Sequence, residues 1–189
     1  MDLDVLRQAA DAGDPEAARE LGHRLCVLEE AIRLERPDTV PEAEHWLRRS
    51  LAARPDDPVT ATLLAGLLVR QHRTALELSS LYDGFGAPGT GRVAWLRSLW
   101  GRRAEAFQWY RRALDADPAH AAAANGLALM VLHPESTDDF VYYTGEASHE
   151  YEYEDDPDWP AEAARRLRAL LAVRPADTMA AASLARLGA

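Results

Sequence analysis

The sequence predicts an all-α fold in which helical hairpins follow one another as an array. Ala and Leu are abundant and Phe is scarce, a composition that favours helix. One unit occurs three times, each time with Ala-Glu at or near its start, an Arg-Arg pair, a Leu-rich stripe and a following Pro. A repeated helical unit is typical of a solenoid, which offers a binding surface rather than a reaction centre. The copies are AEHWLRRSLAARPDD (43–57), AEAFQWYRRALDADPAH (104–120) and AEAARRLRALLAVRPAD (161–177).

Each copy is expected to be a helix that ends near its proline. In the second copy Ala106, Tyr110 and Ala113 lie at offsets 0, 4 and 7, which fall on one helix face. Pro118, at offset 12, then ends the helix. The same offsets hold Ala43, Leu47, Ser50 and Pro55 in the first copy and Ala163, Leu167, Leu170 and Pro175 in the third.

A second helical pattern follows each proline, so each copy and its successor predict a helical hairpin. Asp57 before Pro58 is a good N-cap followed by proline at the first helical position. Asp14 before Pro15 repeats this arrangement near the N-terminus. The segments that follow the three copies are 58–71, 120–132 and 178–189.

The offsets of the three copies resemble those of the tetratricopeptide repeat family. Its second helix carries Ala, an aromatic residue or Leu, Ala and then Pro at this spacing, after a Gly turn that Gly101 matches. The segment LRQAADAGDPEAARELGHRL (6–25) resembles the related Sel1-like repeat through its Ala-Ala, Gly-Asp and Leu-Gly pairs. The resemblance implies a right-handed α-solenoid of about three hairpins, forming one domain over 1–189.

The spacing of the copies departs from that family and predicts insertions between the helices. The prolines at 55 and 118 are 63 residues apart and those at 118 and 175 are 57 apart, against a family period of about 34. We therefore expect insertions at 72–100 and 133–159, and a shorter one near 29–40. Long insertions on one side of a repeat array often form its binding face.

The net charge of the chain is concentrated in one of these insertions. All 21 basic residues are Arg, and residues 134–158 hold ten acidic residues and no Arg, which accounts for the net charge of −10. This segment would repel a nucleic acid and would suit a basic protein partner. Its Tyr-rich part, FVYYTGEASHEYEYE (140–154), alternates with the period of a strand. A short β-hairpin that turns near 144–146 and a disordered segment are the two interpretations.

The remaining composition indicates a cytoplasmic protein that does not cross a membrane. No stretch approaches the roughly 20 apolar residues of a membrane span. The acidic, amphipathic N-terminal segment is unlike a secretory signal. The single cysteine, Cys26, excludes an internal disulfide framework and fits a reducing compartment.

No motif in the chain predicts catalysis, a metal or a cofactor. GAPGTGR (86–92) fits the frame of a phosphate-binding loop, but Arg92 and Val93 stand where Lys and Ser or Thr are needed. His133 and His149 flank the acidic segment without the spacing of a metal site. Cys26 lies in an apolar run, where packing is its expected role. An enzyme or enzyme subunit that uses the inserted loops is the alternative from another class.

Arginine pairs and tryptophans are expected to serve the array itself. The Arg-Arg pairs, as at 48–49 and 111–112, are expected to form a solvated face and to pair with Glu three or four residues away. Binding of an acidic partner is their alternative role. Four of the five tryptophans are expected in the core or between repeats; they are Trp46, Trp95, Trp100 and Trp109.

The sequence thus predicts a non-catalytic protein or peptide interaction module, a scaffold or adaptor. By position, the resemblance implies a groove lined by the first helix of each repeat, with Arg19, His23, Thr62, Arg70, Asn125 and His133. The family's carboxylate clamp is not predicted, because its lysines are missing. The acidic insertion is the second candidate surface, with Tyr142, Tyr143, Tyr151, Glu152, Tyr153 and Glu154. A self-associating array, a homodimer in its simplest form, is a further alternative, because apolar Met179, Leu184 and Leu187 leave the last helix with little polar cap.

Overall fold

The computed structural model describes residues 2–28, 42–82, 102–133 and 158–188, without the side chains of 74–82. In these residues the chain forms α-helices joined by turns, and no strand occurs, which confirms the all-α prediction. The β-hairpin predicted for 140–154 lies outside the described residues. The helices are α1 (Leu3–Asp11), α2 (Pro15–Leu28), α3 (Glu42–Ala53), α4 (Pro58–Tyr82), α6 (Arg102–Ala116), α7 (Ala121–Leu132), α9 (Trp159–Val173) and α10 (Thr178–Arg186).

Aspartate side chains cap several of these helices, as the sequence predicts for two of them. The carboxylates of Asp14, Asp57 and Asp177 accept hydrogen bonds of 2.8–3.2 Å from backbone N–H groups two or three residues further on. Such bonds satisfy N–H groups that have no partner within the helix. Gly13 separates α1 from α2 with a φ of +98°, a conformation that glycine adopts without steric cost.

Two helices extend beyond their predicted bounds. Helix α4 continues to Tyr82, eleven residues past position 71, and so takes up the start of the segment predicted as an insertion at 72–100. Residues 72–82 contain neither Gly nor Pro, so nothing in this stretch ends the helix. Helix α9 begins at Trp159, with Pro160 in its first turn, where proline loses no helical hydrogen bond.

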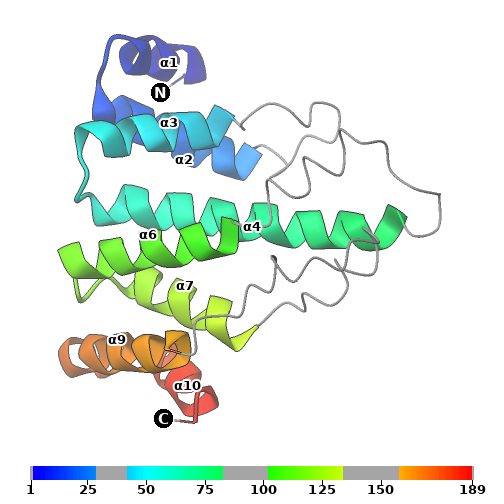
Figure 1. Cartoon of the computed structure of the whole chain (residues 1–189). Coiled ribbons are helices and arrows are strands. Elements are labelled where there is room, and N and C mark those ends of the chain that lie inside the picture. The colour runs from blue at the N-terminus through cyan, green and yellow to red at the C-terminus, as the bar shows by residue number, and fades with distance from the viewer. Residues whose placement is uncertain (1, 29–41, 83–101, 134–157, 189) are drawn as a thin grey trace.

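The helices form two series that alternate along the chain. We call α2, α4, α7 and α10 the A helices, and α3, α6 and α9, which carry the repeated unit, the B helices. Each of the first three A helices packs against the B helix that follows it, and each B helix packs against the next A helix. Neighbouring A helices also meet, and α1 packs on α2. Figure 1 shows the result, with α1 at one end of the molecule and α10 at the other.

The turns from B helices to A helices are alike. Each has four residues, namely 54–57, 117–120 and 174–177. In each, the backbone N–H of the last residue donates to the carbonyl of the first, over 3.3, 3.0 and 3.1 Å. The predicted apolar stripe precedes each turn, and all its residues at offsets 0, 4 and 7 are buried in the three copies. The helical faces inferred from the repeat are therefore confirmed.

A buried ion-pair network joins α3 to α6. Glu44 of α3, which follows Ala43 at offset 0 of the first copy, is 1% exposed. Its carboxylate accepts hydrogen bonds from Arg102, from Gln71 over 3.0 Å and from Arg48 over 2.9 Å. Arg48 also pairs with Glu105 of α6 at 2.7 Å. Burial raises the pKa of Glu105, but hydrogen bonds from Arg48 and Trp109 outweigh it, so the pKa is lowered.

Stacked aromatic rings take the equivalent place between α6 and α9. Phe107 directly follows Ala106 at offset 0 of the second copy, as Glu44 follows Ala43 in the first copy. Trp159 stands four residues before Ala163, just as Arg102 stands four residues before Ala106. The two rings lie 4.2 Å apart between centroids and are tilted by 10°. The two interfaces therefore share one packing register but use different chemistry.

The Arg pairs behave as predicted in part. Arg48 pairs with Glu44 and Arg166 with Glu162 at a spacing of four residues, over 2.8 and 2.7 Å. However, Arg48 and Arg166 also reach carboxylates on the neighbouring B helix, so they contribute to packing between repeats.

Of the tryptophans expected in the core, Trp46 is buried, whereas Trp95 and Trp100 lie outside the described residues.

Candidate functional site

Five of the six predicted groove residues lie on the A helices, but several of them serve the fold. Thr62 donates a hydrogen bond to the carbonyl of Pro58 over 2.7 Å, and Arg70 donates to the carbonyl of Cys26 over 3.1 Å. Asn125 is buried, and its side-chain oxygen has no hydrogen-bond partner among the described residues. Arg70 thus links α4 to the end of α2, and the Thr62 hydroxyl is bonded within the start of α4.

The other predicted groove residues are more accessible. Arg19 pairs with Glu16 one helical turn away, and His23 is exposed on α2. His133 directly follows α7 and is also exposed. Of the six residues, only His133 lines a pocket described below. The structure therefore does not bring the predicted set together at one site.

A pocket of about 340 Å³ opens between α4, α6 and α7. We call it the α4–α7 pocket. Its walls combine apolar side chains with arginine and histidine, and Tyr110 reaches it from α6. The lining residues are Gly66, Val69, His72, Arg73, Arg103, Tyr110, Gly126, Leu129, Met130 and His133.

The Tyr110 ring packs against two glycines of the A helices. A Cβ atom at Gly126 would lie 2.6 Å from Cε1 of Tyr110, whereas a Cβ atom at Gly66 would lie 3.7 Å from the Tyr110 hydroxyl. The ring therefore requires a glycine at position 126 of α7, whereas position 66 of α4 has room for a side chain. Burial raises the pKa of Tyr110 to about 12, although the nearby Arg70 acts in the opposite direction. The hydroxyl is thus protonated at neutral pH.

Alanine substitutions at these two glycines are expected to have opposite effects. We expect Gly126→Ala to lower the free energy of unfolding by about 1–2 kcal/mol, because overpacking costs about 1–3 kcal/mol and exceeds the helical gain of about 0.5–1 kcal/mol. Gly66→Ala has room, so it should raise the free energy of unfolding by about 0.5–1 kcal/mol. Urea unfolding followed by circular dichroism measures both changes. Equal effects at the two positions would contradict this packing of Tyr110.

The permanent charges around the α4–α7 pocket are of one sign. Two arginines, Arg73 and Arg103, line it, and none of its described lining residues is acidic. Arg103 is held in place, since it donates to the carbonyl of Met130 over 2.8 Å and lies 5.8 Å from the centre of the Trp159 ring. Leu129 is 42% exposed and adds an apolar group to the lining of the pocket. The pocket can therefore hold an apolar group beside an anionic one.

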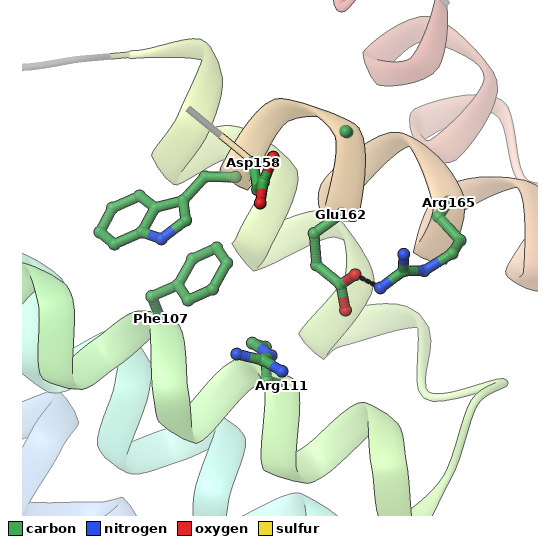
Figure 2. A pocket seen from close by; sticks show the side chains of 7 residues that line it. Phe107, Arg111, Asp158, Glu162 and Arg165 are labelled. Atoms are coloured by element: carbon green, nitrogen blue, oxygen red, sulfur yellow. Dashed lines mark ion pairs between the residues drawn. The ribbon is translucent and has the colours of Figure 1, made fainter. Parts of the chain in front are cut away.

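A second cavity, of about 350 Å³, lies between α6 and α9 and has mixed charges. Figure 2 shows Glu162 and Arg165 of α9 paired with each other, with Phe107 and Arg111 of α6 on the opposite side. Arg111 corresponds in register to Arg48, but it forms no ion pair with a carboxylate in the described part of the chain. Two guanidinium groups and two carboxylates line this cavity, counting Asp158, so it favours neither sign of ligand.

Several predicted features lie outside the described residues. They are the phosphate-loop frame at 86–92, His149 and the insertion residues Tyr142, Tyr143, Tyr151, Glu152, Tyr153 and Glu154. Within the described ranges, Cys26 is buried, and no three His, Cys, Asp or Glu side chains gather where they could hold a metal ion. None of the helices, as far as they are described, combines the length and apolar character needed to cross a membrane.

Comparison with known proteins adds no relative. The chain matches no protein-family model, no curated protein and no solved structure. The site is therefore defined by geometry. Sequence reasoning missed Arg73, Arg103 and Leu129, which point to one pocket only after three helices pack. A local signal did exist at Gly66 and Gly126, since glycine inside a helix is costly and often permits a close approach.

Proposed function

We propose that the chain is a non-catalytic module that binds a protein or peptide in the α4–α7 pocket. The single observation that carries this proposal is an open pocket with arginine and histidine, no acidic lining residue among those described and an exposed leucine. Its described lining includes arginine side chains, which suit recognition of an anionic group, and no nucleophile paired with a base, which a catalytic site would need.

The regular order of the helices supports the wider interpretation as a scaffold. Each A helix up to α7 packs on its B helix, and the two interfaces between B helices use the same register. This succession is what a right-handed α-solenoid of the tetratricopeptide and Sel1-like type would produce. We assign the module to the cytoplasm on its composition, with one cysteine that is buried.

The chemistry of the pocket also indicates which peptides it would bind. Arginine binds carboxylates through charge-assisted hydrogen bonds, and Leu129 and Val69 favour an apolar side chain. The ligand is therefore a peptide that presents an acidic group next to an apolar residue. The acidic insertion, as a separate surface for a basic partner, stays a prediction.

Selection from a random peptide library displayed on phage tests this function. The best peptide is synthesised, and its affinity for the full chain is measured by fluorescence anisotropy. We expect selected peptides to be acidic and Leu129→Glu to weaken binding roughly tenfold or more, because it places a carboxylate in the pocket. Met179→Glu on α10 is the matched control, since Met179 is 56% exposed outside the pocket. Equal affinity of both variants, or no enriched peptide, would refute the proposal.

A further inference from the structure

The two arginines of the α4–α7 pocket differ in how they are placed. Arg73 is exposed, whereas Arg103 is partly buried. The guanidinium of Arg103 donates to the carbonyl of Met130 over 2.8 Å, and Met130 lies in the last turn of α7. The last carbonyls of a helix have no partner within it and carry partial negative charge, so they attract a guanidinium. This bond joins the Arg103 side chain of α6 to the end of α7.

Trp159, the first residue of α9, supplies a second contact for Arg103. The Cζ atom of Arg103 lies 5.8 Å from the centre of the Trp159 ring, within the roughly 6 Å over which an aromatic face attracts a cation. Trp159 is 8% exposed, and such an attraction is stronger where water is excluded. Trp159 is not among the described residues that line the α4–α7 pocket. Helix α9 thus contacts an arginine of the pocket without forming part of the pocket wall.

The Trp159 ring is itself held by α6. Phe107 stacks on it, with 4.2 Å between the ring centres and a tilt of 10°. Arg103 and Phe107 are four residues apart on α6, so they lie on one side of that helix and a single ring can contact both. The packing register that brings Trp159 to Phe107 therefore also brings it to Arg103.

We infer that Trp159 is a positioning residue for the α4–α7 pocket, because it holds the Arg103 guanidinium where it can recognise an anionic group. The inference rests on the proposed function and deepens it, since it names a residue outside the pocket that determines the preference for an acidic peptide. Arginine has many rotamers, and a guanidinium that is already placed loses less of this freedom on binding. The pocket between α4, α6 and α7 then depends on α9 for its specificity.

Combined substitutions test whether Trp159 acts through Arg103. Fluorescence anisotropy gives the affinity of the full chain for the acidic peptide selected on phage and for a neutral counterpart with Gln for Glu and Asn for Asp. Trp159→Met keeps much of the apolar volume without a ring, and should reduce the ratio of the two affinities roughly fivefold. In the Arg103→Gln background the same substitution should leave the ratio unchanged. In the Arg73→Gln background, the matched control, it should still reduce the ratio.

Two further variants separate positioning from packing. Trp159→Phe keeps an aromatic face, which attracts a cation less than indole does, so the ratio should fall only about twofold. Phe107→Leu weakens the same stack but leaves the Trp159 ring in place, so it should lower stability and keep the wild-type ratio. Thermal melting verifies folding, and Trp159→Phe replaces Trp159→Met in the combined variants if the latter does not fold. An unchanged ratio in the Trp159 variant, or an equal reduction in the Arg103→Gln background, would overturn the inference.

Urea unfolding without peptide distinguishes a failure of this inference from a failure of the proposed function. Together, Trp159→Met and Arg103→Gln should change the unfolding constant roughly two- to fivefold less than the product of their separate effects, because the two side chains contact each other. If the wild-type chain prefers the acidic peptide but this coupling is absent, the inference fails and the proposed function stands. If the coupling is present but the wild-type chain binds both peptides equally, the proposed function fails and the inference fails with it.

Discussion

Glu44→Ala is expected to lower the free energy of unfolding by about 3–5 kcal/mol, the range found when one partner of a buried ion pair is removed. Glu44 is nearly inaccessible and accepts hydrogen bonds from Arg48, Arg102 and Gln71, which come from three helices. Without the carboxylate, Arg102, which is largely buried, loses its closest counter-charge. Urea unfolding at neutral pH, followed by circular dichroism, measures the loss.

Glu20→Ala is the matched control for this experiment. Glu20 pairs with Arg24 at a spacing of four residues over 2.7 Å, as Glu44 pairs with Arg48, but both side chains are partly exposed. Exposed pairs of this type contribute roughly 0.2–1 kcal/mol, so the control should lose little. Similar losses in the two variants would show that the buried network contributes no more than a surface pair.

Phe107→Ala is expected to cost about 3–5 kcal/mol, the usual range for truncating a buried aromatic side chain. Phe107 is almost fully buried, and its ring stacks on Trp159 at the start of α9. The truncation leaves a void beside Trp159 and weakens the contact of α9 with α6. Phe107→Leu should cost less, because it preserves most of the apolar volume. A loss below about 1 kcal/mol for Phe107→Ala would contradict the stacked arrangement, as measured by the same unfolding transition.

The shared register of the two interfaces can be tested by exchange. The double substitution Glu44→Phe with Arg102→Trp places the α6–α9 ring pair between α3 and α6. Because each buried aromatic side chain contributes roughly 1.5–3 kcal/mol, the double variant should recover about half or more of the loss seen in Glu44→Ala. Without recovery, the two interfaces would resemble each other in sequence position but not in geometry.

The helices were predictable from the sequence because their signals are local. Apolar offsets, Asp-Pro starts and terminal prolines all act within a few residues, and they located α3, α6 and α9 and the A helices after them. The C-terminal extent of α4 was missed, because the absence of Gly and Pro is weaker evidence than their presence. The sequence does not reveal that the two interfaces between B helices share a packing register, because the pair Glu44 and Arg102 has no residue type in common with the pair Phe107 and Trp159.

The candidate site was less predictable than the fold. Position in the repeat placed Thr62, Arg70 and Asn125 on A helices, but position alone cannot show that their polar atoms serve backbone carbonyls or face the interior. The α4–α7 pocket depends on how the Tyr110 ring packs against Gly126, which is 16 residues away in the sequence and lies on another helix. Such a combination appears only when the helices are packed.

The lengths of the connections bear on how the chain folds. Four-residue turns join α3 to α4, α6 to α7 and α9 to α10, whereas 19 residues separate α4 from α6 and 26 separate α7 from α9. Contacts between residues that are close in the sequence cost less entropy to form than contacts between distant ones, so the hairpins with short turns are expected to form first. Each such hairpin combines the B helix of one repeat with the A helix of the next. The kinetic units of folding would therefore overlap the repeats, so that no repeat is completed before its neighbour has begun to form.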